Sequence, residues 1–195
     1  MFGRMNQSFR LGTWFGLKMS ITPLSVLSYL AVVPLAAGVA GWWGALSVSD
    51  ALSVGAVSVV IMFVCENLHQ WGHSRAARRT GYPMIGVHHF SLFSACLYPL
   101  DEPPLPPAIH IRRALGGFWI NLLIGLLLGA AALSLWPQGG VAGWVTAISA
   151  IWNFFVLGLG ALLPIDIPGV FTIDGGTIWR YLREGKRLQH GGPDE

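Results

Sequence analysis

The chain has 195 residues, of which 53% are hydrophobic and only 11% are charged, and its mean hydropathy is +0.58. Soluble domains carry roughly 25% charged residues, so the composition excludes an ordinary soluble protein and predicts one lipid-embedded domain over residues 1–195. The formal charge of +3 comes without a pattern typical of nucleic-acid binding, and two cysteines are too few for a disulfide framework.

Four apolar segments, near residues 21–46, 52–76, 111–136 and 141–163, are long enough to cross a bilayer, which takes about 20 residues each. The first follows a basic and aromatic leader and is too long for a signal-peptide core. The proline-rich segment 81–107 predicts a loop with short strands or a re-entrant excursion. Residues 176–189 mix apolar and basic side chains, which predicts an amphipathic helix on the membrane surface. The fold class is therefore all-α and polytopic.

The basic residues predict the orientation of the chain. With both termini inside and four crossings, all 12 lysines and arginines fall on one side, and the outer connections 47–51 and 137–140 have none. The positive-inside rule then places both termini in the cytoplasm, and the compact form suits a prokaryotic inner membrane. Membrane lipid is the expected partner. A dedicated anionic-lipid site is an alternative explanation of the charges, but the sequence pattern alone does not support it.

Four polar residues lie on one face of the second apolar segment: Glu66, His69, Gln70 and His73. The motif is one residue away from the zinc-protease helix H-E-x-x-H, and histidines four apart can reach one metal ion. A catalytic zinc usually has three protein ligands. Asp174, followed by Gly175 and Gly176, is the best third candidate because it follows the fourth segment on the side where the second one ends. The alternatives are a polar seam between packed helices without metal and, for Asp-Gly-Gly, a simple turn.

Several motifs in combination resemble the site-2 protease family of intramembrane zinc metalloproteases. They are the leader Arg10–Gly16, the H-x-x-G-H helix His69–His73 with the arginine-rich Ser74–Gly81, the run from Arg113 through Gly117 to Leu123, and Leu162-Leu163-Pro164 leading to Asp174-Gly175-Gly176. The resemblance implies Zn²⁺ held by His69, His73 and Asp174. It also implies cleavage of transmembrane or membrane-proximal peptides near the cytoplasmic face.

The sequence departs from the family pattern at two residues. Gln70 replaces the glutamate that acts as general base, and Ala161 stands where the family has an asparagine thought to help hold the substrate. The stretch 164–174 is also longer than the commonest form. Glu66, one turn before Gln70, is an alternative base, or else a partner for a histidine N–H, or a protonated side chain that is hydrogen-bonded inside the membrane.

Three functions follow as hypotheses. The first is a metal-binding pseudoprotease that binds a transmembrane peptide or a membrane protein partner with weak or no cleavage. The second is an active intramembrane zinc metalloprotease, and the third is a metal-free membrane scaffold. Gln70 favours the first over the second, and enzyme activity stays open. The substrate and the oligomeric state do not follow from the sequence.

Overall fold

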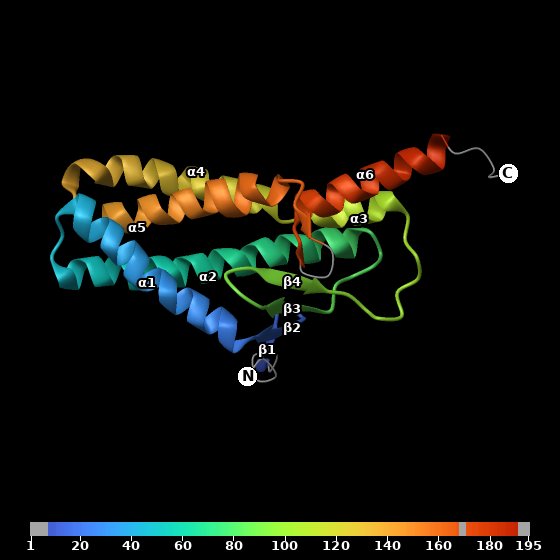
Figure 1. Ribbon diagram of the computed structural model, residues 1–195, viewed down its shortest axis with the longest axis horizontal. Coiled ribbons are helices and arrows are strands. Elements are labelled where there is room, and N and C mark those ends of the chain that lie inside the picture. Colours follow the sequence, from blue (N-terminus) through green and yellow to red (C-terminus); the bar gives the residue numbers. More distant parts are fainter. Residues whose placement is uncertain (1–7, 168–170, 191–195) are drawn as a thin grey trace.

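The computed structural model describes residues 8–167 and 171–190, and the side chains of these residues as far as Arg187. Within these residues four helical segments are long and apolar enough to cross a membrane: Pro23–Gly44, Val48–Arg79, Pro107–Gln138 and Gly140–Leu162. The four predicted spans are confirmed, with boundaries that differ by a few residues. Figure 1 shows them as a bundle, with the α1–α2 and α4–α5 connections at one end.

The first two spans form a tight helical hairpin. Helix α1 (Pro23–Gly44) begins at Thr22, whose hydroxyl accepts a hydrogen bond from Ser25 N at 3.1 Å, with Pro23 in the first turn. Helix α2 (Val48–Arg79) begins at Ser47, whose hydroxyl accepts from Asp50 N at 3.2 Å. The two helices cross closely, because a Cβ atom at Gly55 would lie 2.3 Å from the carbonyl oxygen of Val33.

The third span is broken, whereas the sequence predicted a continuous segment. Helix α3 (Pro107–Ala114) ends before Leu115–Gly117, and α4 (Phe118–Leu135) follows and continues into the 3-10 turn η2 (Trp136–Gln138). The break lies against α2. A Cβ atom at Gly116 would be 2.8 Å from Gly72 O, and one at Gly72 would be 2.3 Å from Gly116 O. This glycine pair lets the two backbones touch.

The fourth span changes its helical geometry before it ends. Helix α5 (Gly140–Ile151) continues as the π-helix η3 (Trp152–Leu159) and the 3-10 turn η4 (Gly160–Leu162). The short strands β5 (Asp166–Ile167) and β6 (Phe171–Thr172) then pair antiparallel, and α6 (Asp174–His190) follows. The predicted C-terminal helix is confirmed, and it begins at the candidate ligand Asp174.

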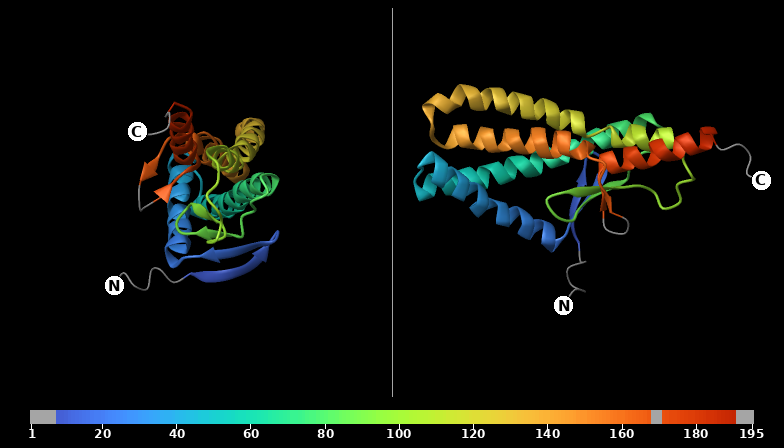
Figure 2. Two further views of the ribbon diagram at one scale, coloured as in Figure 1. Left: turned by 90° about the vertical axis from the view of Figure 1, so that its right-hand side faces the viewer. Right: turned by 45° about the horizontal axis from the view of Figure 1, so that its top comes forward.

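A four-stranded sheet lies beside the end of the bundle from which α3 and α6 project (Figure 2). Its strands are β1 (Phe9–Trp14), β2 (Leu17–Ile21), β3 (Gly86–His89) and β4 (Ser94–Leu97), in that order. The β2–β3 pair is parallel and the other two pairs are antiparallel. The strands predicted within 81–107 are confirmed, but the leader also forms two strands, which the sequence analysis did not predict.

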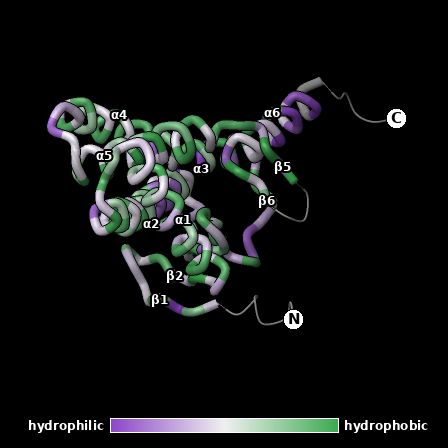
Figure 3. Tube along the Cα trace, turned by 60° about the vertical axis from the view of Figure 1, so that its left-hand side comes forward, coloured by the Kyte–Doolittle hydropathy of each residue, from purple (hydrophilic) through white to green (hydrophobic). Residues whose placement is uncertain are grey.

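The outer surface of the spans is apolar. Figure 3 shows the span helices mostly green and white, and α6 turning purple toward its far end. Large apolar side chains on the spans are exposed, including Leu35, Val60, Leu127 and Leu133, whereas the polar face of α2 is buried. An apolar exterior around a partly polar interior is the arrangement of an integral membrane protein.

Candidate metal centre

His69, His73 and Asp174 meet at one point, although Asp174 lies about a hundred residues farther along the chain. Both Nε2 atoms lie 3.2 Å from Asp174 Oδ2, and the two Nε2 atoms are 2.9 Å apart. The histidines are buried, and the aspartate is half-buried. Ligand atoms about 2.0–2.2 Å from a tetrahedral zinc are roughly 3.3–3.5 Å apart. The three atoms therefore have the spacing of a metal-ligand set to within a few tenths of an ångström.

Two glycines bring Asp174 to the histidines. A Cβ atom at Gly175 would lie 2.2 Å from the carbonyl oxygens of Leu162 and Leu163, and one at Gly176 would lie 2.1 Å from Ile165 O. The start of α6 thus packs directly on the backbone that ends the fourth span. A side chain at either glycine would prevent this close approach.

Each imidazole is oriented through its other ring nitrogen. His73 Nδ1 lies 2.8 Å from the backbone carbonyl oxygen of Arg113. Since a carbonyl only accepts, Nδ1 carries the proton and the Nε2 lone pair points at the shared centre. The third span therefore sets the tautomer of His73 through its backbone, just before its break.

His69 is oriented by a chain of two buried asparagines. Its Nδ1 lies 2.9 Å from Asn121 Oδ1, Asn121 Nδ2 donates to Asn153 Oδ1 at 2.8 Å, and Asn153 Nδ2 donates to Ser149 O at 2.8 Å. The final carbonyl accepts only, so the direction of the chain is determined. Asn121 must present its oxygen to His69, which leaves the Nε2 lone pair free. Such partners of the far ring nitrogen are typical of metal-binding histidines.

Gly117, the last residue of the break, lines the centre. A Cβ atom there would lie 2.5 Å from Nε2 of both His69 and His73. A side chain would thus occupy the space in front of the two lone pairs. The absence of a side chain at residue 117 keeps that space open for an ion.

The ligand triangle requires a positive charge. Burial alone would raise the pKa of Asp174, whereas protonation of the imidazoles at Nε2 would supply the charge and the hydrogen bonds that hold this pKa well below its ordinary value. An ionised carboxylate facing two imidazole lone pairs at about 3 Å is repelled unless a proton or a metal ion lies between them. The donor set of two imidazoles and one carboxylate, with both far nitrogens committed, fits a divalent metal such as zinc.

Gln70 and Glu66 lie beside the centre but face the sheet. Gln70 Oε1 accepts from Cys96 Sγ at 3.1 Å, and Gln70 Nε2 donates to Glu66 Oε1 at 3.4 Å. The same Glu66 oxygen accepts from the backbone N of Ser94 at 3.0 Å and from the Ser94 hydroxyl. Because Asn121 and the Arg113 carbonyl already pair with the histidines, the prediction that Glu66 orients a histidine is wrong. Glu66 instead fastens the start of β4 to α2.

The Arg113 side chain is buried and connects several segments of the chain. Its guanidinium is buried, pairs with Glu102, donates to Tyr82 O at 2.6 Å and lies 4.1 Å from the Tyr98 ring centroid. It therefore joins the loop after α2 to α3, where its own carbonyl oxygen orients His73. This role of the Arg113 side chain was not predicted from the sequence.

The structure brings together all three predicted ligands and places the other candidates around them. Ala161 lies in η4 and is half-buried. Sequence reasoning missed the positioning roles of Asn121 and Asn153. Their signal was available, because an uncharged amide inside an otherwise apolar span also requires a buried partner. The carbonyl of Arg113 carries no sequence signal.

Comparison with known proteins gives one structural match. No family model and no curated protein sequence matches the chain. The site-2 protease from Methanocaldococcus jannaschii is similar in structure, with a TM-score of 0.58 and 19% sequence identity, over 95% of this chain and 74% of that chain. At this identity the match concerns the fold. The four membrane-spanning helices, with the small sheet beside them, form a site-2-protease-like fold.

Proposed function

We propose that the protein is an integral membrane zinc protein, a pseudoprotease that binds membrane segments or a membrane protein partner with weak or no peptide cleavage. The observation that carries this proposal is the pairing of a complete ligand set with an amide in place of a base. His69, His73 and Asp174 converge within 3.2 Å, while Gln70 has no group that can take up a proton. Zinc held by these residues would supply Lewis-acid chemistry.

The contacts of Gln70 support a structural role in joining β4 to α2. Its amide links Cys96 on β4 to Glu66 on α2, and among the described residues it makes no hydrogen bond to the three ligands. A general base must lie within hydrogen-bond reach of the proton that it removes. Glu66 also makes no hydrogen bond to the three ligands among the described residues: its Oε1 atom accepts from Ser94, and its buried Oε2 atom has no hydrogen-bond partner.

The second candidate function is an active intramembrane zinc metalloprotease. It is favoured by the fold and by the orientation of the two histidines. A protein that served only as a scaffold would not need oriented histidines. The metal-free scaffold is the third candidate, and the spacing of the ligand atoms disfavours it.

A Gln70→Glu variant distinguishes the first two functions. We expect it to cleave a model transmembrane peptide about 10²–10⁴-fold faster than the wild-type protein, which is the usual contribution of a general base. The measurement is product formation in detergent micelles by zinc-loaded protein, and Gln70→Glu/His73→Ala is the inactive control. Wild-type cleavage as fast as that of Gln70→Glu would contradict the pseudoprotease. If the zinc-loaded Gln70→Glu variant cleaves no faster than the wild-type protein, a second residue needed for substrate binding is also missing, and Ala161 is the first candidate.

We further propose that both termini are cytoplasmic and that the host membrane is a prokaryotic inner membrane. The proposal rests on the basic residues within the described part of the chain, which gather at the end of the bundle that carries the sheet, α3 and α6. Fusions of a fluorescent reporter that matures only in the cytoplasm should be bright at either terminus and dark after Gly139. A bright fusion after Gly139 would reverse the orientation.

A further inference from the structure

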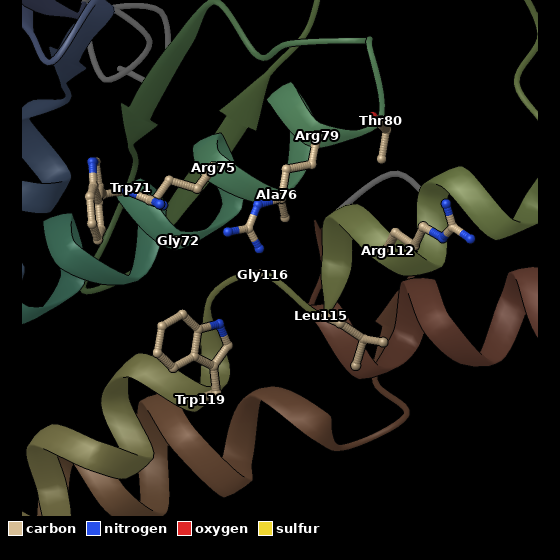
Figure 4. Close-up of a pocket in the computed structure, with 10 residues that line it drawn as sticks. All are labelled: Trp71, Gly72, Arg75, Ala76, Arg79, Thr80, Arg112, Leu115, Gly116 and Trp119. Carbon is tan, nitrogen blue, oxygen red and sulfur yellow. The ribbon is translucent and has the colours of Figure 1, made fainter.

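A cavity lies beside the break in the third span. It has a volume of about 660 Å³ and opens between the last turns of α2 and the α3–α4 junction. Its floor is the contact between Gly72 and Gly116, and its walls include Trp71, Arg75, Arg79, Arg112, Leu115 and Trp119 (Figure 4). None of the metal ligands lines it. The cavity is therefore separate from the metal centre, although residues adjacent in sequence border both.

The cavity gathers positive charge without a counter-charge. Three arginines line it, no acidic residue does, and among the described residues none of the three forms an ion pair. The Arg75 guanidinium lies 4.9 Å from the centroid of the Trp71 ring, and Figure 4 shows Arg79 reaching from α2 toward Gly116 and Trp119. Guanidinium groups bind phosphate oxygens through paired hydrogen bonds. Orienting the chain would need positive charge only on this side of the membrane, and it does not require three arginines around one cavity.

Apolar stripes lead away from the cavity along both helices. Val60, Val64 and Leu68 lie in helical steps before Trp71 and Arg75 on α2, and all three are exposed. On α4, Trp119, Leu123 and Leu126 form the matching exposed stripe. Tryptophan and arginine side chains are typical of the level where hydrocarbon meets headgroups. The arrangement thus provides a charged pocket for a headgroup and apolar tracks for acyl chains.

We propose that this cavity is a binding site for the headgroup of an anionic phospholipid. The phosphate would bind Arg75 and Arg79 from α2 and Arg112 from α3, and the acyl chains would lie along the two stripes. The bound lipid would join the two sides of the break in the third span. A soluble phosphate ion would satisfy the arginines but would leave the stripes unused.

Binding of dioleoylphosphatidylglycerol to the full chain in a non-ionic detergent tests the proposal, with dioleoylphosphatidylcholine as the uncharged comparison. The Arg75→Gln/Arg79→Gln variant should bind phosphatidylglycerol roughly thirty-fold more weakly, and Arg112→Gln roughly five-fold more weakly. The matched control, Arg183→Gln/Arg187→Gln, removes the same charge from α6 and should weaken binding by less than about three-fold. Arg112 is exposed on α3, so its variant also tests the site if the double variant on α2 fails to fold.

Three outcomes would overturn the proposal. Equal losses in the cavity variants and in the α6 control would mean diffuse attraction to a charged surface. Equal affinity for phosphatidylcholine would mean that the arginines do not select the headgroup. Displacement of phosphatidylglycerol by millimolar inorganic phosphate would identify a site for soluble anions instead.

Discussion

At the scale of single residues, Gly117 controls the space in front of the two histidines. It is the last residue of the break in the third span and faces both histidine Nε2 atoms. The hydrogen bonds that His73 Nδ1 donates to Arg113 O and His69 Nδ1 donates to Asn121 Oδ1 hold the imidazole rings in place. The rings therefore cannot retreat from a new side chain at residue 117 without losing buried hydrogen bonds.

Gly117→Ala should abolish metal binding while leaving the membrane fold intact. Its Cβ atom would stand 2.5 Å from both Nε2 atoms, where an ion would have to lie. Gly129→Ala is the matched control on the same helix, because its Cβ atom would meet only Ala150 Cβ, at 4.0 Å. Zinc content by mass spectrometry of the purified proteins measures the effect. Full zinc occupancy in Gly117→Ala would place the ion elsewhere.

His69, His73 and Asp174 could be predicted from the sequence as candidate ligands. The groups that orient the two imidazole rings were harder to predict. A spacing of four places two side chains on one helical face, whatever surrounds them. The groups that orient the rings come from other spans: Asn121 from α4, Asn153 from η3 and a backbone oxygen from α3. Their pairing depends on how the spans pack, which local periodicity does not encode.

At the scale of elements, the sheet shows where sequence reasoning ends. Strand β2 pairs in parallel with β3, so that Ser20 lies opposite His88, almost seventy residues away. A strand of five residues in a basic leader carries too short a pattern to reveal such a distant partner. The break in the third span could not be predicted for a different reason. Glycine is common in membrane helices, and the sequence does not show that Gly116 lies against Gly72 in a neighbouring span.

His89 makes the packing of this sheet sensitive to acid. It is fully buried on β3, its ring lies 5.2 Å from that of Phe63, and neither ring nitrogen has a hydrogen-bond partner among the described residues. Burial, with a smaller contribution from His88, lowers the pKa of His89 to about 4. The unfolded chain, with an ordinary pKa of about 6.5, therefore takes up a proton first as the pH falls.

Stability should consequently be complete above about pH 6.5 and should decrease as the pH falls toward 4. By about pH 5 the loss from His89 is roughly 2 kcal/mol, at about 1.4 kcal/mol for each pH unit. Unfolding in detergent at about pH 7.5 and pH 5 measures it. Between these two pH values the stability of His89→Leu should decrease less than that of the wild-type protein. The stability of His88→Leu should decrease almost as much as that of the wild-type protein. An identical pH dependence in His89→Leu would contradict the assignment.

At the scale of the whole molecule, composition alone was enough to predict a polytopic membrane protein. A chain with so few charges cannot cover a soluble surface, and each of the four spans remains apolar over a bilayer-length window. The fold then brings the end of the fourth span back to α2, so that Asp174 reaches His69 and His73. The convergence of the three candidate ligands is thus a product of the topology, whereas each of them is visible as part of a sequence motif.

The central claim is that these three residues hold one zinc ion. The direct measurement is the zinc content of the purified wild-type protein beside that of His69→Ala/His73→Ala, with His88→Ala as a control outside the centre. We predict one zinc per chain in the wild-type protein and in His88→Ala, and none in the double variant. Zinc that is absent from the wild-type protein, or equal in the double variant, would contradict the metal centre and leave a membrane scaffold with a site-2-protease-like fold.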